Sequence, residues 1–191
     1  MKAKQTKKVE TGEEQIIAAI KGTGNIVQAT INTVTETLSR TFKDTGKVGT
    51  SVTGVVADVV SSAIRGAARV GVDLSQAARG IMVGVLRGTK DTGAEVMETI
   101  SHTAHVAIRD TAKVGGDVEA AATGLVEGAI EGAKELVVSA EEAATAAADG
   151  ALKAAGKVGS IAVQAVRKAV SQPIKGVHVV LQKREAAASR N

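Results

Sequence analysis

His102 and His105 come closer than any other residues in the chain to a metal-binding pattern. Side chains three positions apart lie on the same side of a helix, and an imidazole nitrogen is a common zinc ligand. A zinc site needs at least three protein ligands, however, and the chain has no cysteine, while its third histidine, His178, is distant in the sequence. We therefore expect no metal site.

The other residue patterns that support chemistry are also missing from the sequence. Glu141 and Glu142 are adjacent, so on a helix their carboxylates point in different directions rather than into one acid–base site. Gly22 and Gly24 lack the third glycine and the preceding strand of a dinucleotide-binding loop. No serine or threonine stands in a nucleophile elbow. We expect a protein that is not an enzyme, binds no cofactor and has no catalytic residues.

The composition predicts a thin, closely packed interior. Phe42 is the only aromatic residue among 191, and 21 residues are glycine. The large side chains that usually anchor a core are absent, so the apolar positions hold alanine, valine, isoleucine and leucine. The longest run without a charged residue is 14, from Gly22 to Thr35, which is too short to cross a bilayer.

An internal repeat of 22 residues runs through the sequence. An apolar residue recurs at this interval, and a basic residue follows it in seven of eight copies. The apolar members are Ile20, Phe42, Ile64, Leu86, Ile108, Ile130, Leu152 and Ile174. Gly80, Gly84 and Gly88 are repeated after 44 residues by Gly124, Gly128 and Gly132. Small residues at this spacing either allow another backbone to approach closely or simply keep the polar side of the helix small, and the sequence favours the two interpretations equally.

The period predicts an all-α protein with long amphipathic helices. Twenty-two residues in six turns correspond to about 3.67 residues per turn, close to the α-helix. The chain forms either one extended helix of about 240 Å or an antiparallel helical bundle, for which two to four helices are expected. Thr11 is the predicted start, Gly115-Gly116 the predicted internal break, and Pro173 is expected to end or kink the helix near Ser171.

The repeat places apolar and basic residues on different sides of the predicted helix. The apolar face, which we expect to contact lipid or a partner helix, is represented by Ile20, Val48, Val52, Val56, Val59, Val60, Ile64, Val70, Ile81, Leu86, Val114 and Leu125. The basic column on the other side comprises Lys21, Lys43, Lys47, Arg65, Arg69, Arg87, Arg109, Lys153, Lys157 and Lys175.

Charge and composition divide the chain into three parts. Residues 1–10 form a basic N-terminus that we expect to be flexible, residues 11–182 form the repeat region, and residues 183–191 form a flexible C-terminus. Within the repeat region, residues 117–149 carry eight acids and only Lys134 as a base, so this block has a charge of −7 in a chain of net charge +4. Such a block can lie against a basic repeat of the same chain or another one.

The repeat, with its apolar side of valine, alanine and threonine and its Gly-Thr-Lys-Asp-Thr-Gly at 88–93, resembles the amphipathic 11- and 22-residue repeat proteins. These include the perilipins, the exchangeable apolipoproteins, the synucleins and the late-embryogenesis-abundant proteins, with the granule-coating phasins as a functional analogue. The perilipin-like comparison is the closest, and it implies reversible coating of a lipid surface. The chain departs from apolipoproteins in lacking proline before Pro173, and from late-embryogenesis proteins in being slightly apolar.

Three functions are consistent with this pattern. The first is a coat on a lipid or granule surface, helical when bound, which would place the protein in the cytoplasm at the periphery of that surface. The second is a structural scaffold whose helices pack within or between chains. The third is protection against desiccation. Without aromatic residues to stack on bases, nucleic acid is the less favoured partner.

Overall fold

The computed structural model describes residues 14, 17–18, 25–44 and 51–181 of the chain. Within this part the protein is all-helical, as predicted. The helices are α2 (Ile26–Asp44), α3 (Val52–Val70), α4 (Leu74–Thr89), α5 (Val96–Lys113), α6 (Val118–Leu136), α7 (Ala140–Val158) and α8 (Ser160–Val170). The expected flexible termini, 1–10 and 183–191, and the predicted helix start at Thr11 lie outside the described residues.

Each 22-residue unit is one helix followed by one turn. The residues that precede α3 to α7 are spaced 22 apart and are all polar: Ser51, Asp73, Glu95, Asp117 and Ser139. The Asp73 carboxylate accepts hydrogen bonds from the backbone N–H groups of Ser75 and Gln76, so it caps α4. Before these caps, Gly71, Gly93 and Gly115 adopt positive φ angles in the turns between helices, and Gly71 is itself the C-cap of α3.

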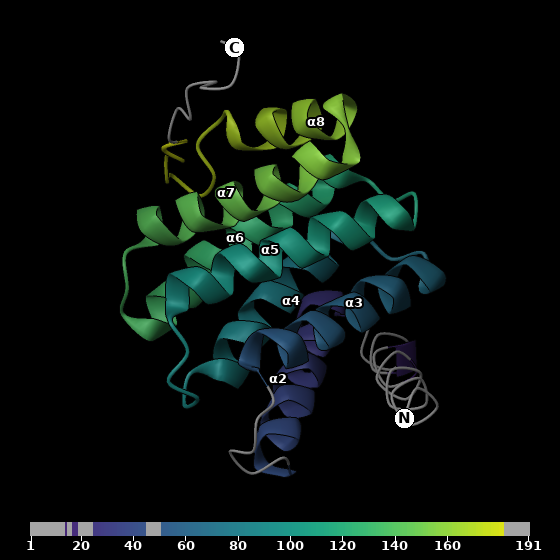
Figure 1. Ribbon diagram of the computed structural model, residues 1–191, viewed down its shortest axis with the longest axis vertical. Helices are drawn as coiled ribbons and strands as arrows, with labels where there is room; N and C mark the ends of the chain where they lie inside the picture. Colours follow the sequence, from purple (N-terminus) through teal and green to yellow (C-terminus); the bar gives the residue numbers. More distant parts are fainter. Residues whose placement is uncertain (1–13, 15–16, 19–24, 45–50, 182–191) are drawn as a thin grey trace, which may run out of the picture.

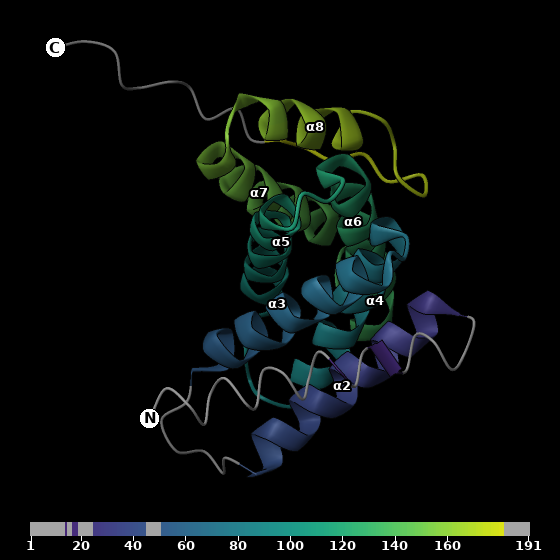
Figure 2. The same ribbon diagram turned by 90° about the vertical axis from the view of Figure 1, so that its right-hand side faces the viewer.

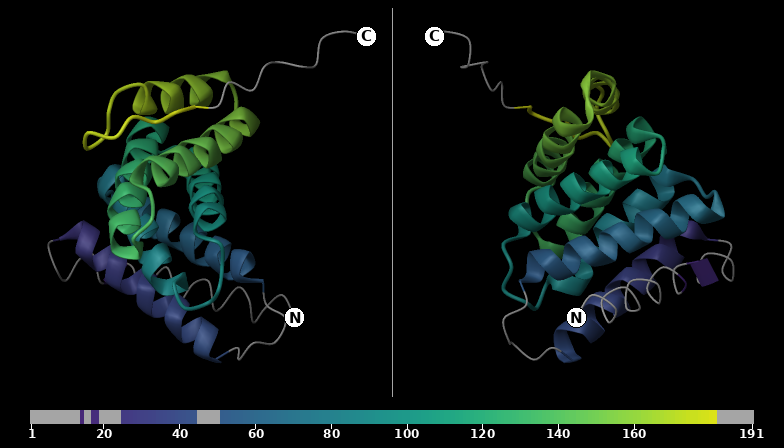
Figure 3. Two further views of the ribbon diagram at one scale, coloured as in Figure 1. Left: turned by 90° about the vertical axis from the view of Figure 1, so that its left-hand side faces the viewer. Right: turned by 45° about the vertical axis from the view of Figure 1, so that its right-hand side comes forward.

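Alternate helices pack side by side in two layers. One layer contains α2, α4 and α6, and the other contains α3, α5 and α7. Because consecutive helices run in opposite directions, the helices within a layer are parallel, and α3, α5 and α7 cross the front of Figure 1 in the same direction. Figure 2 shows the two layers from the side. Helix α8 packs against α6 and α7 at the C-terminal end of the stack (Figure 3).

Glycine permits the close packing of helices within each layer. A Cβ atom on Gly84 would lie 2.8 Å from Cβ of Val34, and one on Gly128 would lie 2.8 Å from Cβ of Met82. In the other layer, a Cβ atom on Gly150 would lie 2.1 Å from the carbonyl oxygen of Ser101. Of the two interpretations that the sequence left open for the repeated glycines, the structure therefore supports the close approach of another helix.

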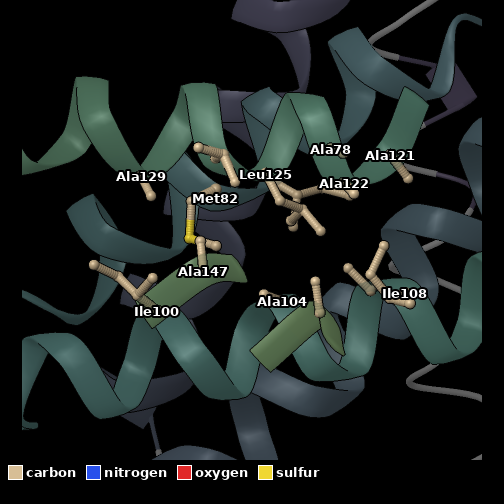
Figure 4. Packing of buried hydrophobic residues seen from close by; sticks show 14 of the residues in the cluster. Ala78, Met82, Ile100, Ala104, Ile108, Ala121, Ala122, Leu125, Ala129 and Ala147 are labelled. Carbon is tan, nitrogen blue, oxygen red and sulfur yellow. The ribbon is translucent and has the colours of Figure 1, made fainter. Parts of the chain in front are cut away.

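The core lies between the layers and consists mainly of small side chains. Met82 and Leu125 from one layer and Ile100 and Ile108 from the other are fully buried, and Figure 4 shows them among the alanines that fill the remaining space. None of the described helices has both the length and the apolar character that a bilayer crossing demands.

The bundle alternative of the fold prediction is therefore the one that holds, and the extended helix of about 240 Å is absent from the described residues. The chain folds back at more places than the two to four helices that we expected, because every repeat carries its own stop and start signals. The predicted break at Gly115-Gly116 falls between α5 and α6, and α8 ends at Val170, shortly before Pro173.

Candidate interaction surfaces

The predicted apolar face forms the interior of the protein. Six of its residues are buried: Val56, Val60, Ile64, Ile81, Leu86 and Leu125. Val52, Val59 and Val70 are half-buried against this core. Val114 is 39% exposed at the end of α5, whereas Ile20 and Val48 lie outside the described residues. The side that we expected to offer to lipid or another helix is thus covered by the helices of the same chain.

The predicted basic column divides between the two layers. Consecutive repeats belong to opposite layers, so a residue that recurs every 22 positions alternates between them. Arg65, Arg69, Arg109, Lys153 and Lys157 belong to the α3–α5–α7 layer, whereas Lys43 and Arg87 belong to the α2–α4–α6 layer and Lys175 follows α8. Lys21 and Lys47 lie outside the described residues.

Ion pairs between neighbouring helices neutralise charge in the α2–α4–α6 layer. The Arg87 guanidinium donates to both carboxylate oxygens of Glu135, at 2.7 and 2.6 Å. Arg79 lies 2.6 Å from Glu131, which also faces the Lys175 ammonium at 3.5 Å. These acids belong to the 117–149 block, so acids of this block lie against bases of the same chain. The hydrogen bond from Arg87 lowers the pKa of Glu135.

Asp110 is the buried charged residue of the α3–α5–α7 layer. Burial alone would raise the pKa of its carboxyl group, but hydrogen bonds from Arg109 and Ser61 and the charge of Arg109 lower it to about 2. Arg109 donates to it at 2.8 and 2.9 Å, and the Lys113 ammonium lies 3.3 Å away. Because Ser61 is on α3 and the other groups are on α5, this network ties the two helices together.

The two central histidines contact different helices. The His102 ring lies 3.1 Å from the carbonyl oxygen of Thr53 on α3. His105 instead faces Gly150 on α7, and burial together with the charges of Lys157, Arg109 and His102 lowers its pKa. No group of three or more potential metal ligands occurs in the described part of the chain. The arrangement makes both rings connectors between helices of one layer.

Two positions at the ends of repeats depart from the pattern, and the sequence analysis did not identify them as exposed sites. Val137 occupies the place of the turn glycines, with a φ of 57° and 91% exposure. Ile161 occupies the place of the polar capping residues and is 83% exposed. The 22-residue spacing could have revealed both positions. Val137 stands where the other repeats have glycine, and Ile161 stands where they have a polar capping residue.

A surface hollow of about 660 Å³ lies at the C-terminal ends of α2, α4 and α6. Phe42 and Leu136 contribute apolar surface to it, and the ion pair between Arg87 and Glu135 lines it as well. Of the charged residues that line the hollow, Arg87 and Glu135 are engaged with each other.

Comparison with known proteins supports the fold alone. No family model matches the chain, and no curated protein resembles it significantly. Among solved structures, the chain is similar to the crystal structure of the de novo designed helical repeat protein DHR7, with a TM-score of 0.52 and 20% sequence identity over 86% of this chain and 90% of the other. The resemblance to perilipins, apolipoproteins or late-embryogenesis proteins receives no support. The fold is a helical repeat.

Proposed function

We propose that the protein is a non-enzymatic structural scaffold that acts as a folded helical stack and presents its charged outer surface to a protein partner. The observation that carries this proposal is the burial of the apolar face. Val56, Val60 and Ile64 are at most 1% exposed, so the repeat uses its apolar surface for its own packing. A stack of this kind has a large regular surface.

Thermal unfolding without lipid tests this proposal. A folded stack should melt in a cooperative transition, and its far-UV circular dichroism spectrum should stay the same when anionic phospholipid vesicles are added. The absence of a cooperative transition, together with a gain of helix on vesicles, would refute the scaffold and favour the lipid coat. A gain of helix only on drying would favour desiccation protection.

Coating of a lipid surface is the second candidate, and the composition of the core supports it. Alanine contributes little apolar area per residue, and the buried Thr103 and Thr111 hydroxyls find no hydrogen-bond partner among the described residues. Both features reduce the cost of opening the stack. Lipid insertion through the predicted face would require such opening, because that face is buried.

A double substitution separates the two candidates. Changing Val56 and Val60 to aspartate would place two charges at buried positions, so the scaffold proposal predicts loss of the cooperative transition in the absence of lipid. The coating proposal predicts in addition that the wild type binds vesicles and that the two substitutions weaken this binding, because they place charges on the face that would insert into lipid. Lys43→Gln with Arg65→Gln is the control. Its melting temperature should lie within about 4 °C of that of the wild type, because surface substitutions usually change the free energy of unfolding by at most about 0.5 kcal/mol each.

A further inference from the structure

The surface hollow at the C-terminal ends of α2, α4 and α6 is bordered by cations that no acid of the stack engages. Its volume of about 660 Å³ falls within the range of small-molecule pockets, about 300–1,000 Å³. On its wall, Arg87 and Glu135 neutralise each other. Lys43 and Lys90 also line it, and neither ammonium group forms an ion pair or a hydrogen bond within the described part of the chain. Two unpaired cations therefore border one concavity.

The hollow lies where α4 ends early in its repeat. Helix α6 continues to Leu136, which lies 44 residues after Thr92, whereas α4 already ends at Thr89. The last turn of α6 therefore has no helical counterpart in α4. Lys90 and Thr92 belong to the turn that follows α4, and both line the hollow. The concavity is thus a departure from the regular repeat, and not a gap that every pair of neighbouring helices would leave.

The two lysines stand at helix ends, where the helix dipole alone favours a base. Lys43 is in the last turn of α2, and Lys90 is the C-cap residue of α4. The dipole accounts for a base at each of these places. It does not account for the fact that both ammonium groups border the same hollow beside an apolar wall.

The apolar wall of the hollow includes the only aromatic side chain of the protein. Phe42, Leu86 and Leu136 line the hollow. At the same position of the repeat, Ile64 in α3 and Ile108 in α5 are fully buried, whereas Phe42 is half-buried. Part of its side chain therefore stays accessible. Accessible apolar surface beside two unpaired cations suits a ligand that has an apolar body and a negative charge.

We propose that this hollow binds a small amphiphilic anion, a molecule in which an anionic group ends an apolar chain. The anionic group is held by Lys43 and Lys90, and the apolar chain lies against Phe42 and Leu136. A concave site of this volume accommodates a single molecule, whereas a membrane presents a flat surface. Asp91 also lines the hollow, and its carboxylate repels an anionic ligand, so it limits the affinity.

Titration with decanoate below its micelle-forming concentration tests the proposal, with calorimetry and NMR spectroscopy as the two readouts. Calorimetry should show saturable binding of one molecule per chain. Phe42 carries the only benzene ring of the protein, so its ring-proton signals report directly on the hollow and should shift as decanoate binds. Decanol, which has no charge, and decyltrimethylammonium, which has the opposite charge, should bind more weakly. Anionic phospholipid vesicles in place of decanoate should leave the signals of Phe42 unchanged.

Exposed charges around the hollow can be removed without disturbing the core. Lys43→Gln with Lys90→Gln should weaken decanoate binding about tenfold, because two exposed ion pairs are lost. Asp91→Asn should strengthen the binding, because it removes a repulsive charge; a cationic ligand would reverse both signs. Lys153→Gln with Lys157→Gln is the matched control. It changes the net charge equally, but both lysines are on α7, which does not line the hollow, so the affinity for decanoate should stay the same.

Several results would overturn the binding site: equal affinity for decanoate and decanol, tighter binding of decyltrimethylammonium, or binding that leaves the Phe42 signals unshifted. A shift of these signals on vesicles that the two lysine substitutions abolish would show that the hollow meets a membrane and not a single molecule. The proposal needs the folded stack but goes beyond its scaffold function, and the two can fail separately. A protein that melts cooperatively without lipid and binds no decanoate would refute the binding site and leave the scaffold standing.

Discussion

Two glycines on α7 allow one substitution to be compared in opposite surroundings. Alanine at position 156 has open space around its Cβ atom, and its better helix propensity should stabilise the protein by about 1 kcal/mol. Alanine at position 150 gains the same propensity, but its Cβ atom would lie 2.1 Å from the Ser101 carbonyl oxygen and 2.8 Å from the carbonyl carbon. Since the obstacle is backbone, α5 and α7 must move apart, and overpacking of this kind costs about 1–3 kcal/mol.

The difference between Gly150→Ala and Gly156→Ala isolates the contact between α5 and α7, because the residue type and the helix are the same. With about 2 kcal/mol between the variants, and about 2–4 °C per kcal/mol in a protein of this size, Gly150→Ala should melt about 4–8 °C below Gly156→Ala. Thermal unfolding followed by far-UV circular dichroism measures this gap. Equal melting temperatures would refute the packing of α5 against α7.

Four further substitutions test three features of the structure. Val137→Gly should raise the free energy of unfolding by about 1 kcal/mol, because valine is strained at a φ of 57°. Gly115→Val should lower the free energy of unfolding by a similar amount, because the backbone at position 115 has a φ of 69°. Urea titration of both variants checks the two signs. Asp110→Asn should destabilise the protein at pH 7 by about 2 kcal/mol, because folding lowers the pKa of the Asp110 carboxyl group from 3.8 to about 2. For the same reason the wild type should lose about this much stability as the pH falls from about 4 to 2. The variant, which lacks the carboxyl group, should lose less stability over the same pH range. Thr103→Val should leave stability unchanged or increase it, because it removes a buried hydroxyl that has no hydrogen-bond partner among the described residues. A melting temperature clearly below that of the wild type would show that the hydroxyl does make a hydrogen bond.

The sequence predicted the helical class, the repeat and the close approach at the repeated glycines, because each depends on local periodicity. It did not distinguish one long helix from many short ones. A 22-residue period suits six turns of a continuous helix and equally suits a helix of 18 or 19 residues with a short turn. The deciding signal was present in Gly71 and Asp73, a glycine that ends one helix followed by a residue that caps the next, and the same spacing of a turn glycine and a cap recurs with Gly93 and Glu95.

The candidate surfaces depended on tertiary packing and were predicted less well. Val56 and Val60 share a face in any helical arrangement, but only the layer structure shows that α5 and its neighbours cover that face. The basic column appeared continuous along the sequence. Since repeats alternate between layers, Arg65 and Arg87 belong to different layers of the molecule, and only the structure pairs Arg87 with Glu135.

One distance in solution tests the repeat architecture most directly. The chain has no cysteine, so Lys90→Cys with Lys134→Cys provides two specific attachment sites for spin labels, both exposed and 44 residues apart. In the stack they lie on adjacent helices whose axes are about 10 Å apart, so pulsed electron paramagnetic resonance should give a label distance below about 30 Å. Dilution with unlabelled protein removes distances between chains. A single distance of about 66 Å, the length of 44 residues of continuous helix, would contradict the folded stack.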